Sequence, residues 1–451
     1  MRKRSASLVA AILLALAVMT PGPVAAQQIR LIRDAEIENI IRLYSTPLFQ
    51  AAGLSPRDID VYLVNDHRLN AFVAGGLNMF IHTGTLMQAD DPLEVIGVIA
   101  HETGHISAGH GATRGESLRQ STTAVIASYV IGLGAALATG RGEVAQAVIA
   151  GGQDIALKGL LSYSRAQESS ADQIAIRLLD GTGQSPKGLL DFMRLVRGQE
   201  VFYASNQDPY LRSHPLTRER IQFLEDQVGK SRYGKTPAPA DLRALHKRMQ
   251  AKLVGFLQPM DQVLGRYPEM DISLPARYAR AIANYRSGDM QNAITLTDAL
   301  LAEHPDDPYF YELKAQILFE SGRVADAVPV YEDSARLLPD SPQIAMALAQ
   351  AQVELNDPQT DQKALRHLAR ALQREPGNAF AWRLTAIVHG RAGDIGMTAL
   401  ALAESALARG QAPEARDQAS RAQKILAEDT PGWLRAGDIE QLASRLADEK
   451  K

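Results

Sequence analysis

The second half of the chain repeats itself about every 34 residues, and this limits the possible folds more than any other feature. Alanines recur at spacings of 34, 34 and 37, at Ala281, Ala315, Ala349 and Ala386. Turn-forming residues recur with the same spacings, at Gly288, Gly322, Asn356 and Gly393. Two further sets run 34, 37 and 34: Ala293, Ala327, Ala364 and Thr398, and Pro305, Pro339, Pro376 and Gly410. One three-residue insertion between Asn356 and Ala364 explains every departure. The period predicts stacked helix pairs.

This pattern resembles the tetratricopeptide repeat, with a small residue where helices touch and a turn residue between them. It departs from the consensus because only Trp382 supplies the tryptophan, and the fourth unit has Thr398 and Gly410 at two signature positions. Two more helices, over about 411–427 and 431–447, are expected to cap the stack. Residues 261–451 are therefore predicted to form an all-α solenoid of about four repeats whose concave face binds polypeptide.

The N-terminus has the order of a secretory signal peptide. Basic residues at positions 2–4 precede a short apolar stretch, Leu8–Met19, and a break at Pro21. A membrane anchor is the alternative, but twelve apolar residues are too few to span about 30 Å of hydrocarbon. Export to the periplasm with cleavage after Ala26 is therefore expected.

Composition excludes several kinds of chemistry. The chain has no cysteine, which rules out disulfides, thiolate metal ligands and a cysteine nucleophile. Its 48 basic and 51 acidic residues give a net charge of −3, which argues against a nucleic-acid partner. At 451 residues the chain is long enough for two or three domains.

Residues 27–260 are predicted to form an α+β domain, so the whole protein is mainly α. A strand is expected over 60–64, and a hairpin over 69–86 around Gly75 and Gly76. Asp91 and Pro92 mark the start of a helix that carries the motif described next. The apolar stretch 122–138 favours a buried helix over a segment that dips into a membrane.

The stretch IAHETGHISAGH contains two histidines four residues apart, His101 and His105, which one helical face can direct at a single metal ion. Glu102 between them is placed to act on water. A third ligand is needed. His110 lies one residue out of the extended metzincin register. Glu168, with Asp172 one turn later, is the other candidate, but spacing alone leaves it open because paired carboxylates are common on solvated helices.

The segments AHETGHISAGH, SRAQESSAD and SHPLTRER are together similar to the zinc-peptidase family that includes the Ste24-type CAAX proteases, the heat-shock protease HtpX and mitochondrial Oma1. This resemblance implies a zincin-type active-site helix and one Zn²⁺ per chain. It implies Glu168 as the third ligand and Asp172 as a residue that orients a histidine, and it places His110 outside the ligand set.

In this family Glu102 is the general base, and His214 and Arg220 are candidates for stabilising the oxyanion. His214 has two interpretations. It either takes the fourth position on the metal and holds the peptidase inactive, or it contacts substrate or has a structural role. The hairpin offers Asn70, Ala71 and Phe72 for substrate binding by strand addition, although plain core strands are the more common use of such residues.

The resemblance, the export signal and the repeats together predict an exported zinc endopeptidase. Its expected substrates are proteins or peptides, in the quality control or assembly of outer-membrane proteins. The repeats would recognise these clients or the outer-membrane assembly machinery, and peripheral association with a membrane is left open. The alternative is a periplasmic chaperone or assembly adaptor whose repeats carry the main function and whose proteolysis is minor or normally autoinhibited.

Overall fold

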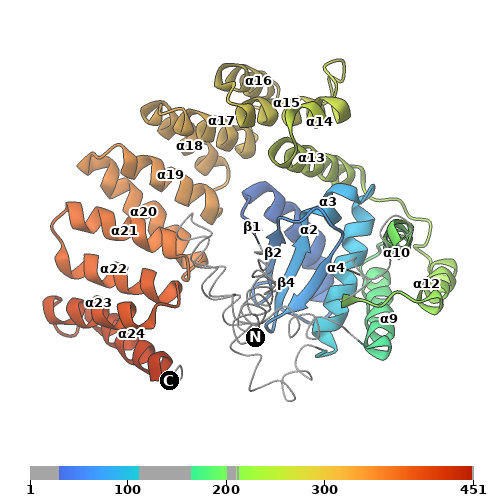
Figure 1. Cartoon of the computed structure of the whole chain (residues 1–451), viewed down its shortest axis with the longest axis horizontal. Coiled ribbons are helices and arrows are strands. Elements are labelled where there is room, and N and C mark those ends of the chain that lie inside the picture. Colours follow the sequence, from blue (N-terminus) through green and yellow to red (C-terminus); the bar gives the residue numbers. More distant parts are fainter. Residues whose placement is uncertain (1–29, 111–163, 201–209, 211–212, 449–451) are drawn as a thin grey trace, which may run out of the picture.

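The computed structural model describes residues 30–110, 164–200, 210 and 213–448, and it is mainly helical, as expected (Figure 1). A small sheet with helices on one face is followed by a curved array of helix pairs. The predicted signal peptide at 1–26 and the apolar stretch 122–138 lie outside the described residues. Within the described ranges, no helix has both the length and the hydropathy needed to cross a bilayer.

Four short strands form the sheet in the order β1-β2-β4-β3. They are β1 (Leu31–Ile32), β2 (Asp60–Val64), β3 (Ala71–Ala74) and β4 (Asn78–His82). β3 and β4 form the predicted antiparallel hairpin. Its turn holds Gly75 and Gly76 at φ values of 63° and 94°, a conformation that glycine adopts without strain. β3 ends the order of described strands, so it is an edge strand.

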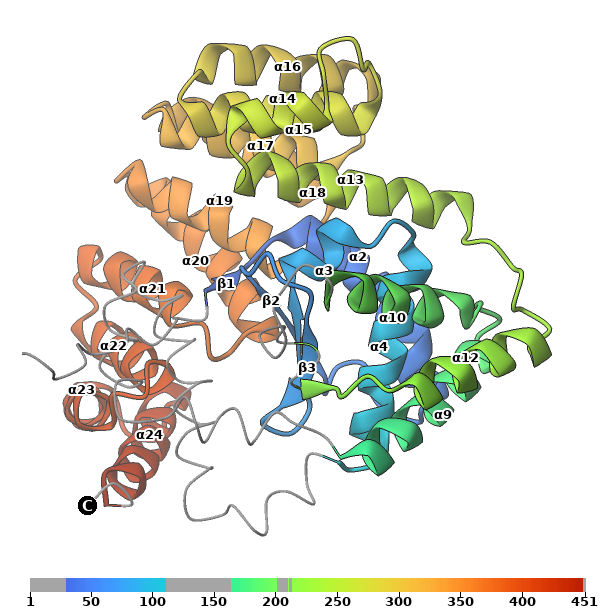
Figure 2. The ribbon, with the colours of Figure 1, turned by 45° about the vertical axis from the view of Figure 1, so that its right-hand side comes forward.

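The described residues before position 231 form six helices, and most of these pack on one face of the sheet (Figure 2). They are α2 (Ala35–Ala51), α3 (Thr83–Gln88), α4 (Pro92–Ser107), α9 (Arg165–Gly181), α10 (Lys187–Glu200) and α12 (Arg218–Lys230). The main core joins α2, the sheet, α4 and α10 through fully buried side chains such as Ile40, Leu63, Val98 and Leu189. Their burial stabilises this domain by about 1.5–3 kcal/mol for each large side chain.

Helix α4 lies at the centre of this layer, with every residue from Pro92 to His105 buried. Two glycines let α10 approach it closely. A Cβ atom on Gly97 would lie 2.5 Å from the backbone nitrogen of Leu189, and one on Gly188 would lie 2.0 Å from the carbonyl oxygen of Leu93. Neither position has room for a side chain, so the helix that carries the motif is held firmly by its neighbour.

The repeats form the predicted helix pairs, which curve around one side of the sheet domain (Figure 1). The helices are α15 (Leu274–Ser287), α16 (Met290–Glu303), α17 (Pro308–Glu320), α18 (Val324–Leu337), α19 (Pro342–Glu354), α20 (Pro358–Arg374), α21 (Ala379–Arg391), α22 (Ile395–Ala408), α23 (Ala412–Ile425) and α24 (Pro431–Asp448). The recurring alanines are buried at the helix contacts. The recurring turn residues have the left-handed backbone that such turns need: Gly288, Gly322, Asn356 and Gly393.

The three-residue insertion lengthens one helix. α20 has 17 residues, whereas α16, α18 and α22 each have 14. Three residues are close to one helical turn, so the insertion keeps the buried face of α20 in register with its neighbours. The predicted repeat pattern is therefore confirmed, together with the way in which it departs from regularity.

The solenoid is attached to the first part of the chain through buried charges. α13 (Ala240–Leu257) contributes Lys252, whose Nζ lies 2.8 Å from Asp34 Oδ2 and 3.2 Å from Glu36 Oε2. Glu36 also accepts a 2.9 Å hydrogen bond from the hydroxyl of Tyr278 on α15 and contacts Arg248. Lys252 and Glu36 are both buried, so removing either one would leave an uncompensated buried charge. These pairs hold the start of the solenoid against α2.

A second contact lies further along the solenoid. Arg33, next to β1, forms an ion pair with Glu375 at the end of α20. α13 packs against α15 and also against α2 and α3, and the short α14 (Met260–Arg266) follows it. The predicted boundary between 27–260 and 261–451 therefore falls next to a helix shared by both parts, and it stays a prediction.

Candidate metal centre

Helix α4 begins as the sequence predicts, and its start fixes the direction of the motif side chains. Asp91 caps the helix by accepting a 2.9 Å hydrogen bond from the Leu93 amide, and Glu94 accepts one of 3.3 Å from the Asp91 amide. This capping box with proline at the first helical position sets the phase of the helix. The motif lies on its third and fourth turns, where the Nε2 atoms of His101 and His105 are 3.2 Å apart.

Helix α9 brings Glu168 to this pair. Ser164 and Gln167 form a second capping box, which places Glu168 in the first turn of α9. Its Oε2 lies 3.3 Å from His101 Nε2, and its Oε1 lies 3.3 Å from His105 Nε2. One carboxylate therefore faces both imidazoles, and all three side chains are fully or almost fully buried.

Gly104, inside the motif, is what permits α9 to come so close. A Cβ atom at this position would lie 2.7 Å from the carbonyl oxygen of Ala171 on α9. Backbone of a neighbouring helix cannot move aside as a flexible side chain does. The glycine therefore costs α4 some intrinsic helix stability but lets Glu168 reach the histidines.

We expect Gly104→Ala to weaken the metal site although alanine is the better helix former. The added methyl group must push α9 outward, which should lower zinc affinity about tenfold or more and destabilise the fold by about 1–3 kcal/mol. Chelator competition and urea unfolding would measure the two effects. Gly229→Ala on α12 is the matched control, because nothing lies within 4 Å of its added Cβ. Equal zinc affinity in the two variants would contradict this role for Gly104.

His214 completes a group of four. Its Nδ1 lies 3.0 Å from Glu168 Oε1, and its Nε2 lies 3.1 Å from the carbonyl oxygen of Ala71 on β3. The ring is fully buried and stacks on Tyr210, with centroids 4.8 Å apart. Each of these residues offers one ligand atom, and the four atoms all lie within 4.8 Å of one another: His101, His105, Glu168 and His214. These residues could therefore all reach one ion.

Asp172 and Arg220 support the group from behind. Asp172 Oδ1 lies 2.9 Å from His101 Nδ1, which turns Nε2 of that ring toward Glu168. Arg220 on α12 donates two hydrogen bonds to Asp172, of 2.7 and 2.8 Å, and its Nη1 lies 2.6 Å from Glu168 Oε2. The guanidinium was expected as a candidate oxyanion donor, but it is directed at these two carboxylates.

His110 contacts the site in a way that the sequence did not indicate. α4 ends at Ser107, and Gly109 has a φ of 66°, which turns the chain back so that the His110 amide bonds to the His105 carbonyl oxygen at 3.1 Å. The Nδ1 atoms of His105 and His110 are 2.9 Å apart. His110 therefore lies on the side of the His105 ring opposite to Nε2. The glycine at the helix end was the available signal.

The electrostatics of the group suit a cation. Burial alone would raise the pKa of Glu168, but the charge of His214 and hydrogen bonds from His101 and His105 hold it far below its usual range. Burial likewise opposes ionisation of Asp172, and the Arg220 guanidinium outweighs it and lowers the pKa of Asp172. An ionised carboxylate among imidazoles is a donor set that Zn²⁺ prefers.

Glu102 provides a further sign that a ligand belongs here. Its side chain is fully buried, and neither carboxylate oxygen accepts a hydrogen bond from the described part of the chain. The closest ring nitrogen, Nε2 of His214, is 3.4 Å from Oε1. Burial raises the pKa of Glu102, and the charges of His214 and His101 offset part of this. A buried carboxylate without partners is costly unless water or metal-bound substrate meets it.

The three residues expected to bind substrate are arranged differently from one another. The carbonyl oxygen of Asn70 accepts a 2.9 Å hydrogen bond from the His82 amide of β4. By the antiparallel register, Phe72 also directs its backbone toward β4, whereas Ala71 directs its backbone away from β4. The Phe72 ring stacks on Phe80. Of the three, only Ala71 presents its backbone on the side where His214 lies.

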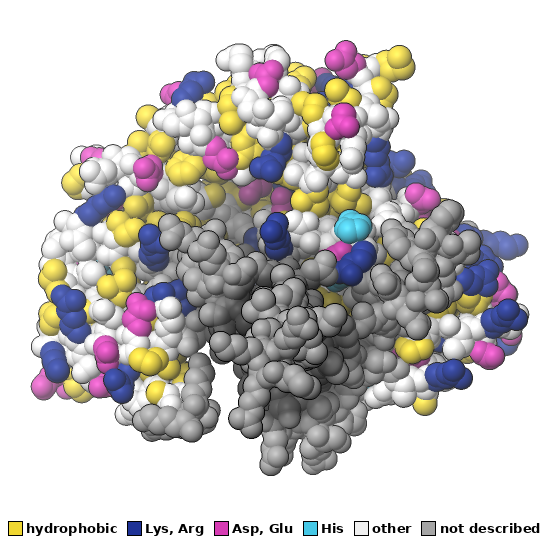
Figure 3. Space-filling view, in the orientation of Figure 1, with side chains coloured by type: hydrophobic (Ala, Val, Ile, Leu, Met, Phe, Trp, Pro, Cys, Tyr) yellow, Lys and Arg dark blue, Asp and Glu magenta, His cyan; other side chains and the backbone are white. Residues whose placement is uncertain are grey.

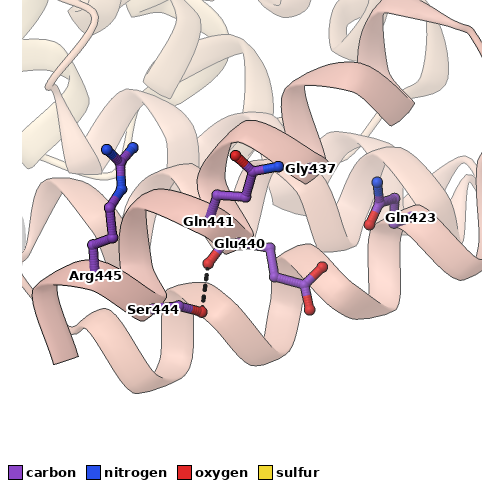
Figure 4. Close-up of a pocket in the computed structure, with 6 residues that line it drawn as sticks. All are labelled: Gln423, Gly437, Glu440, Gln441, Ser444 and Arg445. Carbon is purple, nitrogen blue, oxygen red and sulfur yellow. Dashed lines mark hydrogen bonds between the residues drawn. The ribbon is translucent and has the colours of Figure 1, made fainter. Parts of the chain in front are cut away.

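A surface hollow lies away from this group, between α23 and α24 at the end of the solenoid (Figure 4). It is lined by Gln423, Gly437, Glu440, Gln441, Ser444 and Arg445. It holds one carboxylate and no histidine, so it does not offer the ligands that the buried group offers.

Fold and site together define a metallopeptidase, and comparisons with known proteins agree. The model of peptidase family M48 matches residues 32–228, and a tetratricopeptide repeat model matches residues 278–342 and 312–361. Residues 32–228 therefore form a peptidase domain of the M48 type, and tetratricopeptide repeats follow it in the chain. The protein is a zinc-dependent metalloendopeptidase, as the sequence predicts.

Among its relatives is the beta-barrel assembly-enhancing protease of Yersinia pestis, 25% identical over 362 residues, which are 79% of this chain and 73% of the relative. The protein of the same name from Escherichia coli K12 is 23% identical over 333 residues, or 73% of this chain and 67% of the relative. The mitochondrial metalloendopeptidase OMA1 of Schizosaccharomyces pombe is 28% identical over 185 residues, covering 40% of this chain and 49% of the relative.

Proposed function

We propose that this protein is exported to the periplasm, loses residues 1–26 there, and cleaves protein clients that include outer-membrane β-barrel precursors. The observation that carries the proposal is the buried group of His101, His105 and Glu168 beside Glu102, whose carboxylate accepts no hydrogen bond from the described residues. The solenoid supports a protein client because stacked repeats offer an extended binding surface. The names of the relatives support the barrel precursors as the clients.

We assign the ligand roles to His101, His105 and Glu168. A zinc ion bound there would lower the pKa of a water molecule and polarise the scissile carbonyl. Glu102 takes the proton from the attacking water and returns it to the leaving amine, since its buried carboxylate accepts no hydrogen bond from the described residues. Asp172 and Arg220 hold the ligands in position, because Arg220 contacts both carboxylates.

We further propose that His214 holds the resting enzyme inactive. Its ring sits against Glu168, where a fourth ligand would lie. Nε2 of the same ring lies within hydrogen-bonding distance of the carbonyl oxygen of Ala71. An extended substrate would bond to this oxygen if it added to the edge of β3. A client must therefore break two contacts of His214, one with Glu168 and one with the carbonyl oxygen of Ala71.

This proposal is tested with purified mature protein and an unfolded outer-membrane barrel precursor, followed on gels. We expect slow cleavage by the wild type and about 30-fold faster cleavage by His214→Ala, because two hydrogen bonds of about 1 kcal/mol each no longer compete with substrate. His67→Ala removes an exposed histidine side chain instead and is the matched control, which should behave as wild type. Slower cleavage by His214→Ala would instead assign the ring a role in substrate binding or structure. No cleavage by any form would contradict the protease function itself.

The alternative function, a chaperone or assembly adaptor, rests on the same solenoid. It does not explain the buried group of His101, His105, Glu168 and His214. Four side chains that could bind a metal ion lie together out of solvent. Beside them the carboxylate of Glu102 is buried and accepts no hydrogen bond from the described residues. Such an arrangement costs stability and is retained where chemistry requires it. The protease function is therefore favoured, with the solenoid selecting clients.

A further inference from the structure

The solvent-exposed face of α20 carries a line of four basic side chains. Lys363, Arg366, Arg370 and Arg374 are all exposed and are called the basic stripe below. At 100° per residue they fall within an arc of about 80°, over a length of about 16 Å. The opposite side of the helix holds Ala364, Leu368 and Ala371, which are buried against the neighbouring helices.

The charge of the stripe is only weakly balanced. Within the described ranges, Arg366 and Arg370 form no ion pair. Lys363 lies 3.8 Å from Glu332, and Arg374 lies 3.4 Å from Asp340, and all four of these side chains are about half exposed or more. Exposed pairs of this kind contribute little and are broken readily by a competing anion. The field of the stripe acts on its surroundings, since burial and then Arg370, Arg366 and Lys363 lower the pKa of His367.

The stripe differs from the rest of the surface. The whole chain has a net charge of −3, and the face shown in Figure 3 mixes both signs of charge over the solenoid. Basic residues in one line are therefore not a consequence of composition. The exposed positions beside the stripe are small or polar, such as Gln362, Ala369 and Gln373. Protein interfaces usually centre on a large apolar or aromatic anchor, and this face offers none.

We propose that the basic stripe docks the solenoid on the anionic headgroups of a phospholipid surface. Charge complementarity without an apolar anchor fits a surface of distributed phosphates better than the pocket of a protein partner. Each Lys or Arg near such a surface strengthens binding by about fivefold. Four of them in one line give reversible, salt-sensitive binding that needs neither a spanning helix nor a lipid anchor.

Flotation of the full mature chain with vesicles tests the proposal. We expect binding to vesicles of phosphatidylethanolamine and phosphatidylglycerol, and none to vesicles of phosphatidylcholine alone. Binding should be lost at about 1 M salt, where the screening length falls to about 3 Å. Arg366→Gln with Arg370→Gln should weaken binding by about 25-fold, because two charges are removed. Both substitutions lie on an exposed face, so the rate of hydrolysis of a short peptide should be unchanged. This rate serves as the test that the variant is folded.

Arg416→Gln with Arg421→Gln on α23 is the matched control, with the same change in net charge at two exposed positions. It should bind vesicles as the wild type does. Three outcomes would overturn the proposal: no binding to the anionic vesicles, full binding by the α20 variant, or equal loss in the α20 and α23 variants. The first would point instead to an acidic protein as the partner of the stripe.

Discussion

Glu102→Gln is expected to lower kcat/KM for a protein client by about 10²–10⁴-fold, the usual contribution of a general base. The amide keeps the shape of the carboxylate but cannot take a proton from water. Zinc should stay bound, because Glu102 is not among the four residues that could share the ion. Rates of client cleavage and zinc content, measured on the same preparation, separate loss of chemistry from loss of metal.

Glu94→Gln is the matched control for this change, because Glu94 is a capping residue on the same helix. Glutamine can still accept the hydrogen bond from the Asp91 amide, so cleavage should be unaffected. Client binding should survive in Glu102→Gln, because the solenoid is untouched. If the variant cleaved clients at more than about a tenth of the wild-type rate, Glu102 would not be the general base.

Arg220→Gln is expected to cost about 3–5 kcal/mol of unfolding free energy, which is the usual penalty for breaking a buried ion pair. Arg220 is 5% exposed, and its loss leaves the buried carboxylates of Asp172 and Glu168 without their guanidinium. Asp172 would then orient His101 less firmly, so zinc affinity should fall about 10–100-fold. Urea unfolding and chelator competition measure the two losses.

Arg218→Gln removes an exposed arginine two residues away on the same helix and should change neither quantity. Arg220→Lys should rescue only part of the loss, because an ammonium group cannot bond to Asp172 with two parallel donors. A full rescue by lysine would mean that Arg220 supplies charge alone. Unchanged zinc affinity in Arg220→Gln would contradict its role in positioning the ligands.

The repeats could be predicted from sequence because their determinants are local. Each turn needs a residue that tolerates a left-handed backbone, and each helix contact needs a small side chain, so Gly288 and Ala281 report the fold by themselves. The irregular unit could also be predicted, because its three-residue insertion adds nearly one helical turn to α20 and leaves the repeat pattern recognisable. The start of α4 was local in the same way, set by Asp91 and Pro92.

The site was harder to predict because it depends on contacts between distant segments. Spacing could not decide whether Glu168 is a ligand, since its distance from His101 depends on the close approach of α9 at Gly104. The contacts of Arg220 with Asp172 join α12 to α9 and leave no local signature. Counting residues from His105 does not locate His110 either, because α4 ends at Ser107 and the chain turns back.

The most direct test of the central claim is to locate the metal. Diffraction data collected at the zinc absorption edge from the purified mature protein should show one anomalous peak per chain. We expect it between the Nε2 atoms of His101 and His105 and the carboxylate of Glu168, at about 2.0–2.2 Å from each ligand atom. Fully active protein with no zinc peak at this position would contradict the account.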